Sequence, residues 1–432
     1  MTLTDEERRR GRRNFLKALA GVPPLAAFGA AAVLDGPSRG GPVKAGFIGP
    51  GRQGKVLLGQ CRREFIDLRA ICDINPRNRA EAAEGLVKLG WPRPTLYEDW
   101  REMLAKEDIE AVLIATPLWT HAEMATGALA SGRHVLVEKM MAYDLEGCAR
   151  MAEEARTRRL VLEIGYNRFY APHYQAAYDH VIQAGVIGDI FHVRLMYHRK
   201  QSWRRTSAPP SPDYSPARWG YPTWDHLVNW RLYRQYSQGL VAELGGHQIG
   251  TTCQFLGSAP THALGSGGTY RFTDREVNDH VYVILEHPKG RTVTFSSIES
   301  NDFDHITEQF MGTKGTLVIG SEGEVMLFTD TDSTTPTGIE VTRKDGNAVL
   351  DASESRVADA RGRPAAQPGA AGTGGEDRLL PYRLEIATFC SAIRTGTPLR
   401  CGVERAAQIT ATCVAANKAI ETRTHVPVAT LT

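Results

Sequence analysis

The sequence contains few cysteines, and none of them stands in a pattern typical of metal or disulfide sites. Its seven cysteines are scattered over 432 residues, odd in number, and form neither a CxxC pair nor a Cys/His cluster with zinc spacing. A disulfide framework and a structural metal are therefore not expected, and no metal ligand is predicted. Most of these thiols are predicted to be small buried hydrophobic side chains.

An excess of charge of one sign is also lacking. The formal net charge is +2 at pH 7, and residues 1–40 alone carry three more Lys and Arg than Asp and Glu. The remainder of the chain therefore has a net charge of about −1. A nucleic-acid partner or an anionic membrane surface would require a basic excess, so neither is expected.

A long hydrophobic run is missing as well. A membrane-spanning helix needs about 20 strongly apolar residues, whereas the stretch Ala18–Val33 is shorter, rich in alanine and interrupted by Pro23-Pro24. This stretch fits the apolar part of an export signal instead. The basic segment Arg8–Arg13 precedes it, and Ala30-Ala31-Ala32 offers small residues for cleavage.

The six residues from Arg12 to Lys17, RRNFLK, resemble the twin-arginine motif, whose route exports proteins that are already folded. We therefore predict a twin-arginine signal segment over residues 1–40, the twin-arginine export machinery as a partner, and a periplasmic or otherwise exported location. Two alternatives remain open: a basic, disordered N-terminus beside a short core helix, and an uncleaved anchor.

Beyond this segment the chain is long enough for two domains, and its first part alternates between strand-like and helix-like stretches. Short apolar strands separated by helical patterns are typical of a parallel sheet that is covered on both faces. We predict a Rossmann NAD-binding domain over residues 41–165. Its expected strands are Lys44–Ile48, Leu68–Asp73, Thr95–Tyr97, Ala111–Ala115, His134–Val137 and Val161–Gly165.

From about residue 187 the pattern changes to long strand-like stretches without helices of similar length between them. They lie at residues 190–199, 280–287, 291–300 and 315–329, with a helix expected near Leu240–Leu256. This pattern predicts a mainly antiparallel open sheet in a second α/β domain, residues 166–432, for substrate binding and oligomerisation. The Ala/Gly/Pro-rich residues 352–378 are expected to be a flexible loop, followed by helices Leu380–Arg394 and Val403–Glu421.

The motif Gly49-Pro50-Gly51-Arg52-Gln53-Gly54 fits GxGxxG and stands between a predicted strand and a predicted helix. Such a loop carries glycines for a tight turn, for close approach of a pyrophosphate and for helix packing, and the helix N-terminus attracts phosphates. Asp73 follows the next strand, where a carboxylate accepts hydrogen bonds from the adenosine ribose. We therefore predict NAD as the cofactor, while Arg52 and Arg77 keep NADP as the less favoured alternative.

Several motifs follow one another in the order found in the Gfo/Idh/MocA oxidoreductases, and the chain resembles this family over most of residues 43–425. The resemblance implies a Rossmann domain and an α/β domain whose open sheet carries the substrate pocket and often an oligomer interface. It also implies NAD(P)-dependent chemistry on sugars, cyclitols or their derivatives, and a homo-oligomer is expected. The motifs are GFIGPGRQG, ICDINP, YEDWREML, LIATPLWTHAEMATGALASGRHVLVEKM, EIGYNRFYAPHYQAA and GLVAELGGHQI.

The resemblance also implies the cofactor and catalytic residues. Thr116, Pro117 and His121 match positions along the cofactor, and Glu138-Lys139 matches the family's Glu-Lys-Pro, although Met140 replaces the proline.

His247 matches the family histidine, with Glu243 in place of the usual aspartate and Gly250 in place of a second one. Imidazole titrates near neutrality and suits the role of base, whereas an ammonium stabilises a developing alkoxide. We expect His247 as base, Lys139 as its electrostatic partner and Glu243, four residues earlier on a helix, as the group that orients the imidazole.

Two further groups are expected to contact the substrate. Tyr166, Asn167 and Arg168 follow a predicted strand end, and Asn229, Trp230 and Arg231 lie in the aromatic and polar run Trp219–Tyr236. Aromatic faces stack on sugar C–H groups, and arginine binds hydroxyls or acids. A packed surface loop is the alternative for the second group.

Export and NAD binding appear in one chain, although free NAD is scarce outside the cytoplasm. A cofactor that stays bound and is regenerated in each cycle resolves this conflict, and twin-arginine export permits folding around it first. We therefore predict an NAD(P)-dependent oxidoreductase of a sugar, cyclitol or sugar derivative with tightly bound cofactor. An NAD-dependent glycosidase that uses transient oxidation and elimination is the alternative, and an NAD-binding regulator without catalysis is a third.

Overall fold

The structure is a computed structural model that describes residues 3–20, 40–320, 323–329, 341–344, 347–350 and 378–430. Its N-terminal part contains a six-stranded sheet, sheet A, in the order β3-β2-β1-β4-β5-β6 with every pair parallel. Its strands are β1 Val43–Ile48, β2 Ile66–Cys72, β3 Thr95–Tyr97, β4 Ala111–Ile114, β5 His134–Glu138 and β6 Leu162–Gly165. The order reverses between β1 and β4, where such sheets bind ligands at the carboxyl ends of their strands.

Helices cover both faces of sheet A, which explains why its central strands are apolar on both sides. Asn75, Asp99 and Asp144 cap three of these helices by accepting hydrogen bonds from backbone N–H groups of the first turn. The helices are α3 Arg52–Gln60, α4 Pro76–Lys88, α5 Trp100–Lys106, α6 His121–Ala130 and α7 Leu145–Arg158. Helix α11 (Leu380–Thr395), from the end of the chain, packs beside α3 and shares its hydrophobic core.

The second part contains an eight-stranded sheet, sheet B, in the order β13-β12-β11-β7-β10-β9-β8-β16. Only β7 and β10 pair in parallel among these strands, so the predicted fold class is confirmed. The strands are β7 Ile190–His198, β8 His262–Gly268, β9 His280–His287, β10 Arg291–Ile298, β11 Ile306–Gly312, β12 Gly315–Gly320, β13 Glu324–Thr329 and β16 Val426–Pro427. A separate hairpin joins β14 (Val341–Lys344) to β15 (Asn347–Leu350).

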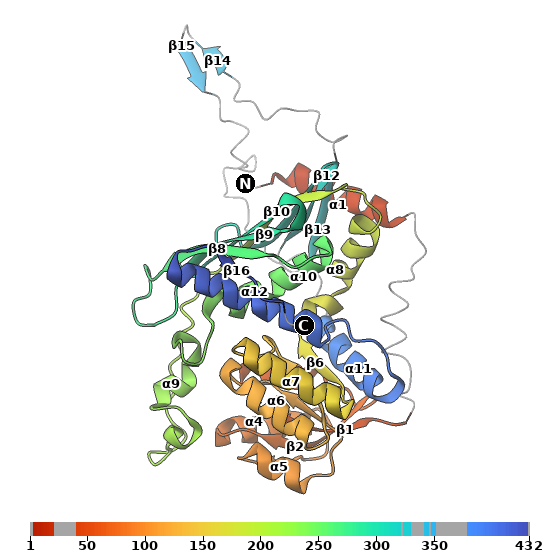
Figure 1. Ribbon diagram of the computed structural model, residues 1–432, viewed down its shortest axis with the longest axis vertical. Coiled ribbons are helices and arrows are strands. Elements are labelled where there is room, and N and C mark those ends of the chain that lie inside the picture. The colour runs from red at the N-terminus through yellow and green to blue at the C-terminus, as the bar shows by residue number, and fades with distance from the viewer. Residues whose placement is uncertain are drawn as a thin grey trace.

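One face of sheet B is packed against helices. Helices α10 (Gly246–Leu256) and α12 (Val403–Thr422) lie between sheet B and the Rossmann domain (Figure 1), and α8 (Pro172–Ala177) lies beside them. Along β9, inward Val281, Val283 and Leu285 are buried, whereas Tyr282 and Ile284 remain about half exposed at 53% and 43%. The other face of this part of the sheet is therefore open.

The basic segment near the N-terminus belongs to a helix. Helix α1 (Asp5–Ala20) packs against β13, with Phe15 buried and the Asn14 side chain donating to the Leu327 carbonyl at 3.3 Å. Arg12 forms an ion pair with Glu324. Residues 21–39, which include most of the expected apolar stretch, and residues 351–377, which include most of the expected loop, lie outside the described part. No helix in that described part is long and apolar enough to span a membrane.

A long connection after β7, residues 199–236, lies against the Rossmann domain, and we call it the strap. It contains the short helix α9 (Trp224–Val228), which lies at the side of the molecule in Figure 1. Arg77 donates to the carbonyls of Ala208 and Pro209, both at 2.9 Å. The Tyr214 hydroxyl donates to the Ile74 carbonyl at 3.1 Å. The strap therefore joins the two parts of the chain directly beside the end of β2.

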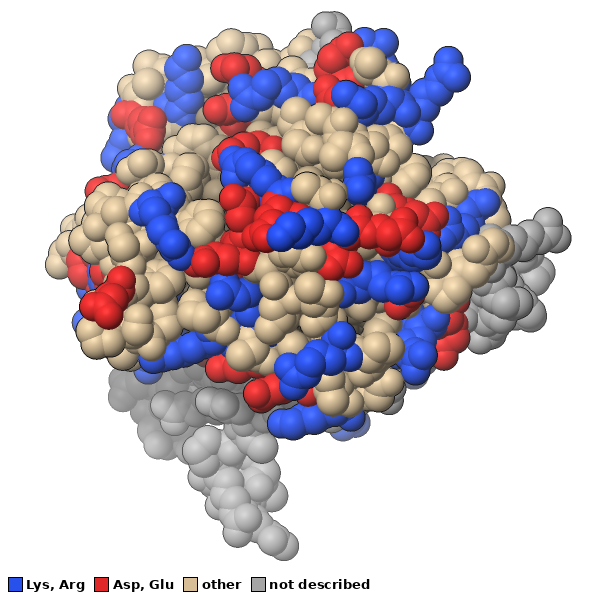
Figure 2. All heavy atoms as spheres, turned by 90° about the horizontal axis from the view of Figure 1, so that it is seen from below, with Lys and Arg blue, Asp and Glu red and all other residues tan. Residues whose placement is uncertain are grey.

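The face seen from below carries charges of both signs. Figure 2 shows Lys and Arg intermixed with Asp and Glu on this face, at the Rossmann end of the molecule. No broad field of one sign covers this face, in keeping with the nearly neutral composition.

Candidate functional site

A cavity of about 820 Å³ lies where the glycine loop, the strap and helix α10 meet. Its volume is at the upper end of the usual range for small-molecule sites. Most of the residues that the sequence predicted for the site line it. They are Gly49, Gly51, Arg52, Gln53, Asp73, Thr116, Pro117, His121, Glu138, Lys139, Asn167, Arg168, Trp230, Arg231, Glu243 and His247.

The glycine loop has the shape that a dinucleotide requires. Gly49 has φ +83°, and a Cβ there would lie 2.7 Å from the Thr116 methyl group. A Cβ on Gly54 would lie 2.3 Å from the Gly49 carbonyl oxygen, so this glycine lets helix α3 approach the loop. Gly51 faces open space, and α3 begins at the next residue, Arg52. The loop and the free N–H groups of α3 therefore fit a pyrophosphate.

Asp73 occupies the position expected for the ribose contact, at the end of β2. Its carboxylate accepts hydrogen bonds from the Asn75 backbone at 2.7 Å and from the Asn78 side chain at 3.0 Å. Burial nevertheless raises the pKa of Asp73 to about 6, so the carboxylate is mostly charged at neutral pH. Arg77, one of the two arginines that kept NADP as an alternative, donates hydrogen bonds to carbonyls of the strap.

His121 is buried between the ends of β4 and β5. Its Nδ1 lies 2.8 Å from the Met140 carbonyl oxygen and its Nε2 lies 3.0 Å from the Thr116 carbonyl oxygen. Burial lowers the pKa of His121, which favours a neutral ring that can donate only one of these hydrogen bonds. This histidine therefore packs between the two segments and donates a hydrogen bond to one of their carbonyls at a time.

Glu138 and Lys139 stand at the end of β5. The Gln53 amide donates to Glu138 at 2.8 Å, and burial raises the pKa of the Glu138 carboxyl. Lys139 Nζ donates to the Glu243 backbone carbonyl at 2.7 Å and lies 4.0 Å from the Glu243 carboxylate. The peptide bond between Lys139 and Met140 is cis. Lys139 thus bridges the Rossmann domain and the start of the α10 region.

His247 lies in the first turn of α10 and lines the same cavity. Burial lowers the pKa of His247 well below its usual value, and the positive charges of Lys139, Arg168 and Arg199 add to this effect. The imidazole is therefore neutral at physiological pH. Its buried Nδ1 has no hydrogen-bond partner among the described residues, and the Tyr166 ring packs edge-on against it at 5.9 Å between centroids.

The expected contact between Glu243 and His247 is not formed. Glu243 accepts a hydrogen bond from Arg231 Nε at 3.0 Å instead, and no hydrogen bond or ion pair joins it to His247. The reason is local: Val241–Gly245 forms a π-helical turn, which has more residues per turn than an α-helix. Side chains four residues apart are therefore not stacked on one face. In this structure Glu243 therefore does not contact the imidazole that it was expected to orient.

Two predicted substrate residues lie elsewhere than expected. Tyr166 is fully buried behind His247 and does not line the cavity. Asn229 is also buried, and its side chain binds the Arg205 backbone and the Asp225 carboxylate. Asn229 therefore shapes the strap instead of facing the cavity. Arg168 does line the cavity, but it is paired with the buried Glu308.

The strap contributes several lining residues that were not predicted from the sequence. Arg199 and Arg205 lie in the basic stretch RKQSWRR directly after β7, and Trp203 lies between them. This stretch of charge beside a predicted strand end was a usable signal. The contact of the strap with the Rossmann domain was not visible, because it joins segments more than 100 residues apart.

Comparison with known proteins identifies both parts of the chain. A family model described as "Oxidoreductase family, NAD-binding Rossmann fold" matches residues 43–166, and one described as "GFO/IDH/MocA C-terminal domain" matches residues 176–318. The Glycosyl hydrolase family 109 protein 1 of Shewanella sp. (strain ANA-3) is 28% identical over 270 residues, which are 58% of this chain and 57% of that protein. The chain thus spans little more than half the length of the curated relatives that it matches.

Solved structures share the fold. The scyllo-inositol dehydrogenase from Lactobacillus casei, solved with NAD(H) and scyllo-inositol, has a TM-score of 0.64 and 19% identity, covering 90% of this chain and 99% of that chain. A levoglucosan dehydrogenase in complex with NADH and levoglucosan has a TM-score of 0.65 and 21% identity, covering 89% of this chain and 99% of that chain.

Proposed function

Because the chain belongs to the Gfo/Idh/MocA family of oxidoreductases, whose N-terminal domain is an NAD-binding Rossmann fold, we propose that it oxidises a secondary alcohol of a sugar, cyclitol or sugar derivative. The observation that carries the proposal is that Lys139 and His247 line one cavity together with the glycine loop. The printed ligands of the structural neighbours, scyllo-inositol and levoglucosan, support this substrate class.

The roles of the side chains follow from their surroundings. Bound NAD supplies the hydride acceptor. His247 is neutral and takes the hydroxyl proton on an imidazole nitrogen. Lys139, fixed by its hydrogen bond to the Glu243 carbonyl, places its ammonium where the alkoxide charge develops. Cationic neighbours disfavour the imidazolium, so His247 readily returns the proton when the reaction runs in reverse.

We further propose that NAD is held tightly and regenerated in place. The strap supports this, because its hydrogen bonds to Arg77 and Ile74 lie directly after Asp73. The strap must detach before the adenosine end of NAD can leave the site, so we expect it to slow the release of NAD. The test is to incubate the purified protein with a panel of sugars and follow the absorbance of reduced nicotinamide without added NAD. Reduction with any sugar supports the proposal, and no reduction across neutral and charged sugars contradicts it.

A redox-neutral glycosidase is the second candidate, and the named relatives from glycosyl hydrolase family 109 favour it. In that reaction His247 and Lys139 would assist the oxidation of the sugar to a transient ketone. Elimination would then cleave the glycosidic bond, and the hydride would return to the sugar. Aryl glycosides distinguish the two functions. Release of the aglycone without lasting reduction of bound nicotinamide indicates the glycosidase, whereas stable reduction without aglycone release indicates the oxidoreductase.

Export by the twin-arginine route remains our proposal for Arg12 and Arg13, which makes the export machinery a transient partner and the periplasm the destination. Cell fractionation of the chain with Arg12→Lys and Arg13→Lys combined tests it: retention in the cytoplasm is expected, and unchanged export contradicts it.

A homo-oligomer is also proposed, supported by exposed Phe191, Tyr282 and Ile284 on sheet B. Light scattering after gel filtration tests this, and a monomer contradicts it.

A further inference from the structure

The cavity is more cationic than an uncharged sugar requires. Seven Lys or Arg side chains and four Asp or Glu side chains line it among the described residues. Two of the carboxylates, Asp73 and Glu98, lie at the adenosine end of the site, where the strap meets β2 and β3. Across the whole lining, the positive side chains therefore outnumber the negative ones by three.

Some of these cations already have a carboxylate partner. Arg168 is paired with Glu308, and Arg231 is paired with Glu243. Arg199 and Arg205, in contrast, have no carboxylate within 4.0 Å among the described residues. Arg199 is only partly exposed, and its charge acts on Glu299 without forming an ion pair with it. An anionic ligand would supply the ion-pair partner that Arg199 lacks.

Arg199 lies at the substrate side of the cavity. Its guanidinium donates to the Tyr197 hydroxyl at 2.8 Å and lies over that ring at 4.8 Å from its centroid. These contacts fix its direction, and its charge acts on His247. A group bound to Arg199 would therefore lie close to the proposed base.

Arg205 stands among other cations. Partial burial, and after it the charges of Arg231 and Arg52, lower the pKa of Arg205 to about 10. Arg52 is the first residue of helix α3 and lines the cavity beside the position expected for the pyrophosphate. The pyrophosphate of the cofactor therefore explains the positive charge of Arg52. The cofactor's phosphates do not account for Arg199, which acts on the histidine of α10.

We propose that the sugar substrate carries a carboxylate, as in a uronic acid glycoside, and that Arg199 binds this carboxylate. This inference rests on the proposed function. Guanidinium groups bind carboxylates through paired hydrogen bonds, which gives both charge and orientation. A second cavity of about 340 Å³ shares Arg199, Gln201 and Arg378 with the first and adds Lys200 and Asp302. This cavity gives the rest of the glycoside a path outward.

The test compares matched substrates on the NAD-loaded full chain. Methyl glucuronide and methyl glucoside differ only in a carboxylate at C6, and galacto and manno pairs extend the panel. We expect kcat/KM to favour the acid by about tenfold or more in at least one pair. Arg199→Met should remove most of this preference, mainly through KM. Arg150→Met, which removes a surface arginine paired with Glu146 on α7, should retain it.

Each other outcome has a defined meaning. Turnover of neutral glycosides with equal or greater efficiency overturns the carboxylate assignment and leaves the proposed function standing. Preference for a sugar phosphate over the matched uronide also overturns the assignment of a carboxylate to the substrate. In that case only the conclusion that the site binds an anionic group stands. Failure of every sugar, acidic or neutral, to reduce the bound nicotinamide overturns the proposed function itself. An Arg199→Met variant with the wild-type preference refutes the role of that arginine.

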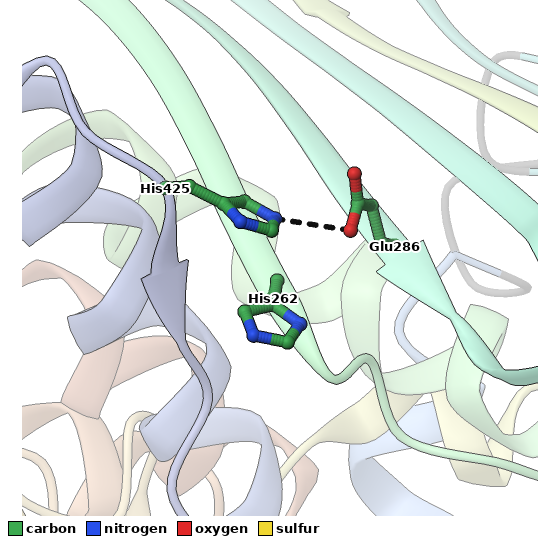
Figure 3. Close-up of side chains that lie close together, drawn as sticks. All are labelled: His262, Glu286 and His425. Atoms are coloured by element: carbon green, nitrogen blue, oxygen red, sulfur yellow. Dashed lines mark hydrogen bonds and ion pairs between the residues drawn. The ribbon is translucent and has the colours of Figure 1, made fainter.

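A second, independent observation concerns the edge of sheet B. His262 begins β8, Glu286 lies opposite it on β9, and His425 directly precedes β16 (Figure 3). His425 Nε2 lies 3.0 Å from a Glu286 carboxylate oxygen, and the two imidazoles stack at 4.3 Å between centroids. One ligand atom from each residue lies within 4.8 Å of the other two.

We infer that these three side chains bind a divalent transition metal of the zinc class. Two imidazole nitrogens and one carboxylate oxygen are ligands that zinc accepts, and a fourth position can be taken by water. The half-exposed His425 and Glu286 leave room for that water. Because two ligands lie on β8 and β9 and the third, His425, directly precedes β16, the metal would fasten the C-terminal strand to the sheet. Spacing along the chain could not show this, since strand pairing alone brings the residues together.

Zinc binding to the NAD-loaded chain after treatment with a chelator tests the site. Equilibrium dialysis should find one zinc more in the wild type than in His262→Ala or His425→Ala, with a higher Tm when zinc is present. His192→Ala, a histidine of β7 outside the cluster, serves as control and should bind like the wild type. Equal zinc binding in all four proteins, or none in the wild type, refutes the site. Circular dichroism confirms that the variants are folded.

Discussion

The rate at which NAD leaves the protein should depend on the strap. Arg77 donates two hydrogen bonds of 2.9 Å to the carbonyls of Ala208 and Pro209, beside the Asp73 corner of the cavity. Arg77→Met removes both while keeping the length of the side chain. The arginine is exposed, so the two bonds together should contribute only about 1–2 kcal/mol, which corresponds to release that is about 5- to 30-fold faster.

The assay loads the protein with NADH, adds a large excess of NAD and follows the loss of bound-NADH fluorescence. Arg101→Met is the matched control, because Arg101 is also an exposed arginine of the Rossmann domain but pairs with Glu123, away from the strap. Release from this control should match the wild type. If Arg77→Met releases NADH at the wild-type rate, or if both variants accelerate equally, the strap does not retain the cofactor.

Four other predictions follow from the site and the core. Gly54→Ala should abolish stoichiometric NAD binding, measured by calorimetry, because the added methyl would lie 2.3 Å from the Gly49 carbonyl oxygen. Lys139→Met should lower kcat by about 100-fold while bound NAD remains, and an equal loss of NAD would contradict its role. Since the pKa of His247 is lowered, its neutral form persists in mild acid, and the acid limb of kcat/KM should break below pH 6.5. Arg394 lowers the pKa of Glu110 to about 2, so this pair stabilises the fold above the unfolded pKa near 4.5, and chemical denaturation should show the loss as pH falls from there toward 2.

The sequence predicts the Rossmann half well for a physical reason. Its strands are apolar on both faces and its helices begin at capping residues, so local patterns carry most of the information. Asp144, for example, accepts a hydrogen bond from the Gly147 backbone and caps the helix Leu145–Arg158. In sheet B, β8 reads HALGSGG and lacks the branched residues that mark a strand. β8 forms a strand because it pairs with β9, since its own composition does not favour one.

The site itself is only partly readable from the sequence. Motif residues such as Lys139 and His247 reach the cavity as expected, because the glycine loop and the strand ends determine their positions. The π-helical turn before α10 redirects Glu243 to Arg231, and no local pattern marks it. Arg199 and Arg205 depend on how the strap folds across the Rossmann domain. Such long-range packing has no signature in residue spacing.

The most direct test of the account is the nicotinamide content of the protein as isolated. Protein purified without added nucleotide is denatured, and the supernatant is analysed by mass spectrometry. A tightly held cofactor predicts NAD in the supernatant in an amount stoichiometric with the chain, together with turnover that needs no external supply. Protein that releases no nicotinamide nucleotide, and that turns over only while NAD is continuously added, would contradict it.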